Sequence, residues 1–191
     1  MHELGTDGSP AGLGARPQRL VVVCGTGTEV GKTWVAAAVL RECRRRGLSV
    51  AARKPAQSFD ADPSTGTTAH TDAEVLAAAS GEDPTAVCRH DRSFPVALAP
   101  PMAAEALGRA PFTLRDLVAE LDWPRPPVSL GVVELAGGVR SPQAADGDAI
   151  DLVRRLRPDA VVLVADAGLG TINAVRLSVS ALATVTDGSA S

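Results

Sequence analysis

Short apolar runs alternate with amphipathic stretches along the chain. The runs at residues 20–23, 48–52, 129–135 and 160–165 predict buried strands. Between them, apolar residues at helical spacing predict helices over residues 34–46, 72–79, 102–107, 113–121, 148–156 and 171–182. Strands that alternate with helices predict an α/β fold with a doubly wound, mainly parallel sheet and helices on both faces. The near-continuous Val and Leu content of residues 160–165 predicts a strand that is covered on both faces.

Polar patterns mark where these elements begin. Thr71 and Glu74 have capping-box spacing before the helix at residues 72–79, and Thr113 and Asp116 start a later helix. Residues 57–71 form a long polar stretch, and a loop of that length is usually functional or disordered. Residues 84–101 are rich in proline and are expected to be irregular.

Composition narrows the class of protein. The chain has 191 residues and a net charge of −3, which fits one domain and argues against a broad nucleic-acid surface. Cys24, Cys43 and Cys88 have no metal or redox spacing, so we expect reduced thiols in a cytoplasmic protein. No apolar run reaches the roughly 18 residues of a membrane span. We expect a disordered tail at residues 1–18, one domain at 19–185 and a second tail at 186–191.

The segment Gly25–Thr33 lies between the first strand and the first helix and has the sequence GTGTEVGKT. Glycines let several backbone N–H groups converge on a phosphate, and the helix N-terminus adds partial positive charge. Lys32 would reach the outer phosphates, and the hydroxyl of Thr33 would ligate Mg²⁺. Thr26 stands where the strict phosphate-loop pattern has glycine. A glycine-rich turn with a chance Gly-Lys-Thr is the alternative, which the flanking strand and helix disfavour.

Polar residues come after the other strands at the edge where a parallel sheet binds its ligands. Lys54 and Ser58 come after the second strand, and Glu134 ends the third. An unpaired charge is costly to bury, so a metal role suits Glu134. Lys54 could instead be a solvated lysine, and Asp72 could be only a favourable first-turn carboxylate.

These motifs together resemble those of dethiobiotin synthetases. The resemblance covers residues 20–182 and rests on five blocks in the same order: the phosphate loop, Lys54-Pro55-x-x-Ser58, Thr71-Asp72-Ala73, Glu134-x-Ala136-Gly137-Gly138 and Leu169-Gly170-Thr171-Ile172-Asn173. It implies an ATP- and Mg²⁺-dependent ligase that closes a cyclic urea on 7,8-diaminopelargonate with CO₂, through a carbamate and a mixed phosphoric anhydride. It also implies a homodimer. The net charge and the lack of a long apolar run predict neither a nucleic acid nor a membrane as partner.

The resemblance also implies roles for individual residues. Lys32 and Lys54 would be catalytic, and Thr33, Asp72 and Glu134 would hold Mg²⁺. Ser58, Thr171 and Asn173 would bind the substrate. The nucleotide site would consist of Glu29, Val30, Gly31, Lys32, Thr33, Trp34, Asp72, Glu134, Leu135, Ala136 and Gly137.

The chain departs from the family pattern at some positions. Phe59 and Leu135 stand where the family usually has glycine, and Leu135 is expected to add bulk beside the nucleotide. The family normally continues into segments that read adenine, so we expect a domain shortened at its C-terminal end with weak base discrimination. Two alternatives remain: a regulatory ATPase of the partition or septum-positioning type, and a non-catalytic relative that binds nucleotide. The first usually carries another lysine early in the phosphate loop, and this loop lacks one.

Overall fold

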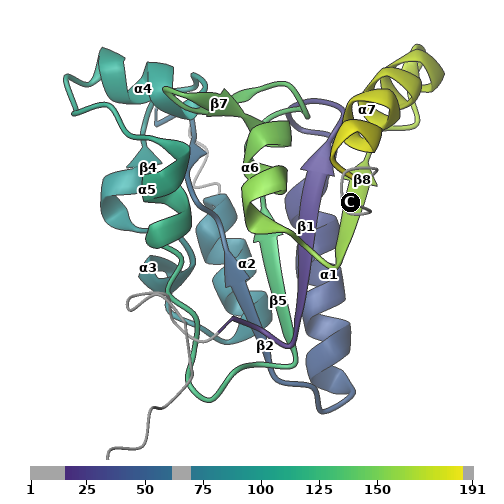
Figure 1. Ribbon diagram of the computed structural model, residues 1–191. Helices are drawn as coiled ribbons and strands as arrows, with labels where there is room; N and C mark the ends of the chain where they lie inside the picture. The colour runs from purple at the N-terminus through teal and green to yellow at the C-terminus, as the bar shows by residue number, and fades with distance from the viewer. Residues whose placement is uncertain (1–15, 62–69, 187–191) are drawn as a thin grey trace, which may run out of the picture.

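The computed structural model describes residues 16–61 and 70–186, and Figure 1 shows their arrangement. The strands are β1 (Arg19–Gly25), β2 (Val50–Arg53), β3 (Gln57–Ser58), β4 (Ser93–Phe94), β5 (Leu130–Glu134), β6 (Pro142–Ala144), β7 (Gly147–Asp148) and β8 (Ala160–Val164). The helices are α1 (Lys32–Arg45), α2 (Asp72–Ser80), α3 (Pro84–Val87), the 3-10 helix η2 (His90–Arg92), α4 (Pro100–Ala106), α5 (Leu114–Ala119), α6 (Ala149–Leu156) and α7 (Thr171–Thr186).

The central sheet has the strand order β2-β5-β1-β8. All three neighbouring pairs are parallel, and Val22 of β1 lies opposite Val133 of β5 and Val161 of β8. The predicted parallel α/β fold is therefore confirmed. Parallel strands end at the same edge, so the loops after β1, β2 and β5 start close together.

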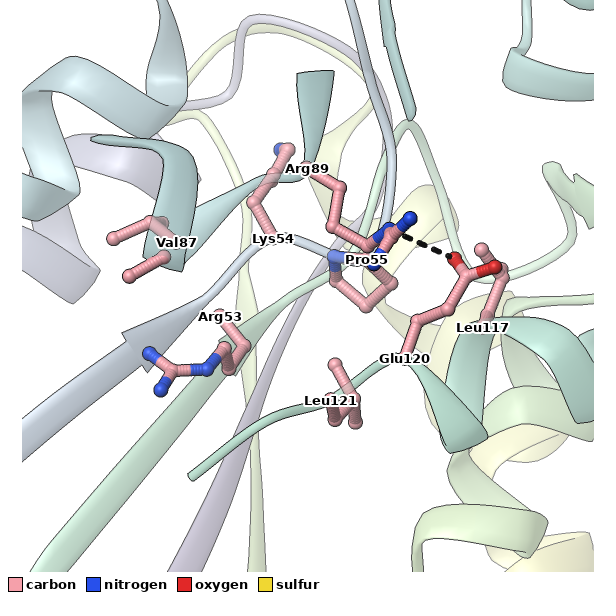
Figure 2. A pocket seen from close by; sticks show the side chains of 9 residues that line it. Arg53, Lys54, Pro55, Val87, Arg89, Leu117, Glu120 and Leu121 are labelled. Carbon is pink, nitrogen blue, oxygen red and sulfur yellow. Dashed lines mark ion pairs between the residues drawn. The ribbon is translucent and has the colours of Figure 1, made fainter. Parts of the chain in front are cut away.

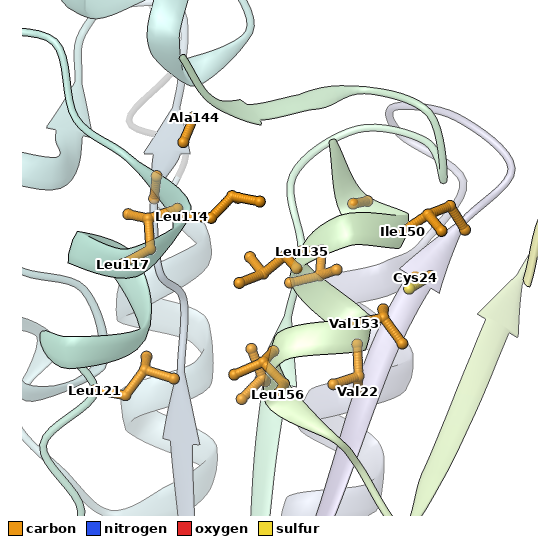
Figure 3. Close-up of a cluster of buried hydrophobic side chains, with 14 of the residues drawn as sticks. Val22, Cys24, Leu114, Leu117, Leu121, Leu135, Ala144, Ile150, Val153 and Leu156 are labelled. Atoms are coloured by element: carbon orange, nitrogen blue, oxygen red, sulfur yellow. The ribbon is translucent and has the colours of Figure 1, made fainter. Parts of the chain in front are cut away.

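Helices cover both faces of this sheet. Val23, Val132 and Ala52 face one side, where they pack with Leu40 of α1 and Leu76 of α2. On the other side Val22 and Val133 pack with residues of α4, α5, α6 and α7. Figure 3 shows part of this second cluster, with α6 lying across β1 and β5. Successive strand residues point to opposite faces, so each strand contributes to both clusters.

Several predicted helix starts are confirmed by their caps. Thr71 accepts a hydrogen bond from the N–H of Glu74 in a complete capping box, and Thr113 caps α5 in the same way with Asp116. The predicted start of α1 at residue 34 was two residues late. Gly31, with a left-handed φ of 92°, is its N-cap, so the last two residues of the phosphate loop already belong to the helix.

The prediction that residues 160–165 form a strand covered on both faces was wrong. β8 lies at the edge of the sheet, with β1 as its neighbour among the described strands. Ala160 and Val162 are exposed, whereas Val161 and Leu163 are partly buried on the face that α6 and α7 cover. An unbroken apolar run therefore did not distinguish an edge strand from a central one.

Short elements were also missed. Gln57–Ser58 and Ser93–Phe94 pair as parallel strands in segments that were expected to be loop or irregular. Residues 62–69 of the long polar stretch lie outside the described part of the chain, as do residues 1–15 and 187–191 of the expected tails. The predicted N-terminal tail was too long, because the N–H of Gln18 donates to the carbonyl of Val128 at 2.9 Å.

Candidate active site

The phosphate loop folds tightly around its own lysine. A Cβ on Gly25 would lie 2.8 Å from Cδ of Lys32 and 2.9 Å from the carbonyl oxygen of Gly27, so only glycine fits there. Glu29 has a left-handed φ of 59°, which bends the loop before the helix. Lys32 is buried, and its Nζ donates to the carbonyl of Gly27 at 2.6 Å. The lysine thus lies across the loop where a phosphate would be cradled.

Four side chains from four elements converge beside this loop. Oγ1 of Thr33, on α1, lies 2.8 Å from Oδ1 of Asp72 and 2.8 Å from Oε1 of Glu134. Nζ of Lys54, just after β2, lies 2.8 Å from Oδ2 of Asp72 and 2.7 Å from Oε1 of Glu134. Lys54 and Glu134 are buried, and Asp72 is half-buried at the start of α2. The predicted convergence of these residues is therefore observed.

The oxygens of this cluster fit a small divalent cation. The hydroxyl of Thr33 has one hydrogen, so it donates to only one of the two carboxylates that it touches. Mg²⁺ binds oxygens at roughly 2.0–2.1 Å in an octahedron, which places neighbouring ligand oxygens about 2.9 Å apart. Thr33 meets this spacing with both carboxylates. Oε2 of Glu134 is buried without a hydrogen-bond partner among the described residues, which leaves it available to a ligand.

The charged side chains of this cluster lie close enough to shift one another's pKa values. Burial by itself lowers the pKa of Lys54, but the carboxylates of Glu134 and Asp72 outweigh it, so the pKa is raised and the ammonium stays charged. Burial raises the pKa of Asp72, and Lys54 more than reverses that effect. The pKa of Lys32 is lowered, first by burial and then by repulsion from Lys54. The site therefore contains two lysines and two carboxylates in close electrostatic contact.

The end of β2 that presents Lys54 is anchored by Arg53. The guanidinium of Arg53 pairs with Glu82 at 2.7 Å, donates to the carbonyl of Asp122 and stacks on the ring of Trp123. Figure 2 shows the side chains of Arg53 and Lys54 leaving the strand end in different directions. The small cavity there, of about 20 Å³, has room for roughly one water molecule and none for a substrate.

Ser58 ends β3, and its buried Oγ has no hydrogen-bond partner among the described residues. Gln57, which sequence analysis missed, binds both neighbouring elements: the N–H of Ala73 donates to its Oε1, and its Nε2 donates to Oγ of Ser93. A wider cavity of about 460 Å³ is lined by Gln57 and Phe59 but not by the two lysines. The candidate active site is therefore identified by the cluster of charged side chains, and not by this cavity.

The loop after β5 lies against the phosphate loop. A Cβ on Gly138 would be 3.1 Å from the carbonyl oxygen of Thr26, so the two loops approach closely. Both backbone groups of Ala136 bond to the side chain of Gln143, and Gly137 has a left-handed φ of 62°. The side chain of Leu135 points into the hydrophobic core (Figure 3) and is 1% exposed. The expectation that Leu135 adds bulk beside the nucleotide was therefore wrong.

The remaining predicted residues lie apart from the cluster or at its margin. Glu29 and Trp34 are exposed on the phosphate loop and α1, and Val30 packs partly against the core. Thr171, at the start of α7, donates to the carbonyl of Asp166 at 2.8 Å, and Asn173 is exposed. Among the hydrogen bonds and ion pairs of residues 16–61 and 70–186, none joins Thr171 or Asn173 to the cluster.

The chain is similar to known proteins over most of its length. The profile of a family described as "AAA domain" matches residues 19–186. An ATP-dependent dethiobiotin synthetase from Haloferax mediterranei is 41% identical over 163 residues, which is 84% of this chain and 64% of the relative. Enzymes of the same name from Rhodococcus jostii and Anaeromyxobacter dehalogenans are each 40% identical, over 85% and 86% of this chain and 67% and 70% of their own length. The chain thus spans about two thirds of these relatives. No helix among the described residues is long and apolar enough to cross a membrane.

Proposed function

The chain belongs to the ATP-dependent dethiobiotin synthetase family, and we propose that it closes a cyclic urea on 7,8-diaminopelargonate. CO₂ adds to one amine of the substrate to give a carbamate. A carbamate oxygen attacks the γ-phosphorus of ATP and ADP leaves. The second amine then attacks the carbonyl carbon, which closes the ring and releases phosphate.

The observation that carries this proposal is the position of Lys54. Its ammonium touches the same two carboxylates that flank the phosphate-loop residue Thr33. Nucleotide binding alone needs no second buried lysine there, whereas a carbamate that must lie in line with a γ-phosphate needs a cation beside it. Lys54 would hold the carbamate, and Lys32 would stabilise the charge that spreads over the transferred phosphoryl oxygens.

Mg²⁺, when bound, would neutralise phosphate charge during the transfer. Thr33, Asp72 and Glu134 would hold it, because hard oxygen ligands suit this ion. Glu29, Val30, Gly31 and Trp34 would surround the phosphates. Ala136, Gly137 and the backbone of Leu135 would border the nucleotide, and the unpartnered hydroxyl of Ser58 would contact the diamine.

The positions of Thr171 and Asn173 suit a role in a dimer. In one copy of the chain they lie at the start of α7 and make no hydrogen bond to the Lys54 cluster among the described residues. We propose that they bind the distal carboxylate of a substrate held by a second copy, which requires a homodimer. We also place the activity in the cytoplasm, where ATP is available and where thiols such as Cys24, Cys43 and Cys88 remain free.

A turnover assay tests the function directly. The protein is incubated with diaminopelargonate, bicarbonate, Mg²⁺ and ATP, and both ADP and the cyclic urea are measured over time. We expect the two products in equal amounts and only when the diamine is present. ADP release at the same rate without the diamine would indicate a regulatory ATPase, and nucleotide binding without any ADP would indicate a non-catalytic relative.

A further inference from the structure

The ammonium of Lys54 contacts both carboxylates that the proposed function assigns to a divalent cation. It is 2.7 Å from Oε1 of Glu134 and 2.8 Å from Oδ2 of Asp72. The same Oε1 also lies 2.8 Å from the hydroxyl of Thr33. Lys54 is 2% exposed and Glu134 is fully buried, so this contact is shielded from water.

We propose that Lys54 is the resident cation of this site in the nucleotide-free protein, and that it leaves both carboxylates when a divalent cation binds. The inference rests on the proposed function for the identity of the metal ligands. It adds that the metal and the lysine compete for the same two carboxylates. Metal binding then has a second effect, because it frees the lysine for the carbamate.

The two carboxylates need a cation beside them both with and without bound metal, for electrostatic reasons. A buried carboxylate such as Glu134 is costly unless a positive charge is paired with it, and Asp72 adds a second negative charge. Lys54 meets this requirement in the metal-free protein. A divalent ion on the same oxygens would lie within a few ångströms of Nζ, where like charges repel strongly at low dielectric constant. The two cations therefore compete for these carboxylates.

Lys54 can move, whereas its neighbours are held. A lysine side chain has a flexible four-carbon stem, so its ammonium can swing while the backbone stays fixed. The backbone at residue 54 is fixed by a hydrogen bond from its N–H to the carbonyl of Val87 at 2.8 Å. Arg53 is held by Glu82 and Trp123, and Lys32 is bonded to Gly27. Lys54 is therefore the cation that can yield to a metal.

The test measures metal binding without nucleotide or substrate. Mn²⁺ is titrated into the full chain, and the free ion is measured by electron paramagnetic resonance, for the unchanged protein, Lys54→Met and Arg92→Met. We expect Lys54→Met to bind Mn²⁺ about tenfold or more tightly than the unchanged protein, because no ammonium has to be displaced. Arg92→Met is the matched control: it also removes a partly buried cation, but one paired with Glu120, and it should leave the Mn²⁺ affinity unchanged.

Thermal unfolding gives an independent readout. Lys54→Met should melt at a lower temperature than the unchanged protein in the presence of a chelator, and Mn²⁺ or Mg²⁺ should restore most of the loss. Arg92→Met should also melt at a lower temperature, but neither metal should restore the loss. If Lys54→Met is too unstable to purify, Lys54→Gln keeps a hydrogen-bond donor without the charge and should show the same metal response.

Equal Mn²⁺ affinity in the unchanged protein and the Lys54 variants, with melting temperatures that metal does not raise, would overturn the proposal. That result would leave open whether the protein makes the cyclic urea. Conversely, the Lys54 variants could bind metal more tightly while the unchanged protein shows no turnover. That result would reject the proposed function but support the exchange between Lys54 and a divalent cation.

Discussion

Gln57 accepts a hydrogen bond from the backbone N–H of Ala73 at 2.9 Å through its buried side-chain oxygen. Its amide nitrogen donates to Oγ of Ser93 at 2.8 Å. One side chain therefore ties β3, α2 and β4 together. Because Ser58 is next to Gln57 in the chain and Asp72 is next to Ala73, this contact sets the distance between a substrate residue and a metal residue of the proposed site.

Replacing Gln57 by leucine is expected to weaken both the fold and the site. The N–H of Ala73 would lose its partner in a buried position, which costs roughly 1–3 kcal/mol. Denaturant unfolding would measure this loss, and the KM for the diamine should rise as Ser58 and Asp72 lose their fixed spacing. Ser129→Ala, at an exposed hydroxyl pair with Ser49, is the control and should change neither quantity. An unaltered KM in Gln57→Leu would show that the contact serves stability alone.

The sequence was sufficient to predict the four strands of the central sheet and the site residues at the ends of these strands. Glu134 and Lys54 were predictable, because neighbouring parallel strands bring the residues at their carboxyl ends to one edge of the sheet. Gln57 was not, since its role depends on Ala73 and Ser93, which are distant in sequence. The exposure of Val162 was also not predictable: an edge strand and a central strand can have the same apolar run, and strand order depends on long-range pairing.

Removing a core side chain should cost far more than removing an exposed one of the same type. Leu152 of α6 is fully buried in the core cluster, so Leu152→Ala should destabilise the protein by about 2–5 kcal/mol through lost burial and a cavity. Leu169 is fully exposed, and Leu169→Ala should stay within about 0.5 kcal/mol of the unchanged protein. Urea unfolding of both variants checks the contrast. Similar losses in the two would mean that Leu169 is covered in solution.

Two buried thiols should make the protein sensitive to alkaline pH. Burial raises the pKa of Cys24 from 9.0 to about 12, and it does the same for Cys88. Between these values the unfolded chain loses thiol protons that the folded protein keeps, so stability falls as pH rises from about 9 towards 12. Each thiol contributes a slope of about 1.4 kcal/mol per pH unit. Lysines also titrate in this range, so the comparison is between the unchanged protein and Cys24→Ala.

Cys24→Ala should lose stability at neutral pH but should show a shallower decline above pH 9 than the unchanged protein, by about 1.4 kcal/mol per pH unit. Urea unfolding at a series of pH values measures both slopes. Parallel curves would contradict the burial-driven shift in the pKa of Cys24. The cysteine belongs to β1, and its side chain lies in the core (Figure 3).

Replacing Lys32 by alanine should abolish most turnover. The ammonium lies within the phosphate loop and is the group placed to stabilise charge on the transferred phosphoryl oxygens. We expect kcat to fall on the order of 100-fold or more, since removing one such electrostatic contact has that effect in other enzymes. Thermal melting of the variant without nucleotide is the control for folding. A kcat within a few-fold of that of the unchanged protein would show that Lys32 does not stabilise the transferred phosphoryl group.

Replacing Lys54 by alanine should separate nucleotide binding from product formation. The phosphate loop is built by residues 25–33 and its own lysine, so the variant should still bind ATP with Mg²⁺ in a calorimetric titration. The carbamate would lose the cation that fixes it in line with the γ-phosphate, and formation of the cyclic urea should stop. Loss of nucleotide binding and turnover together would mean that Lys54 mainly holds Asp72 and Glu134 in place. Near-normal product formation would show that another residue orients the carbamate.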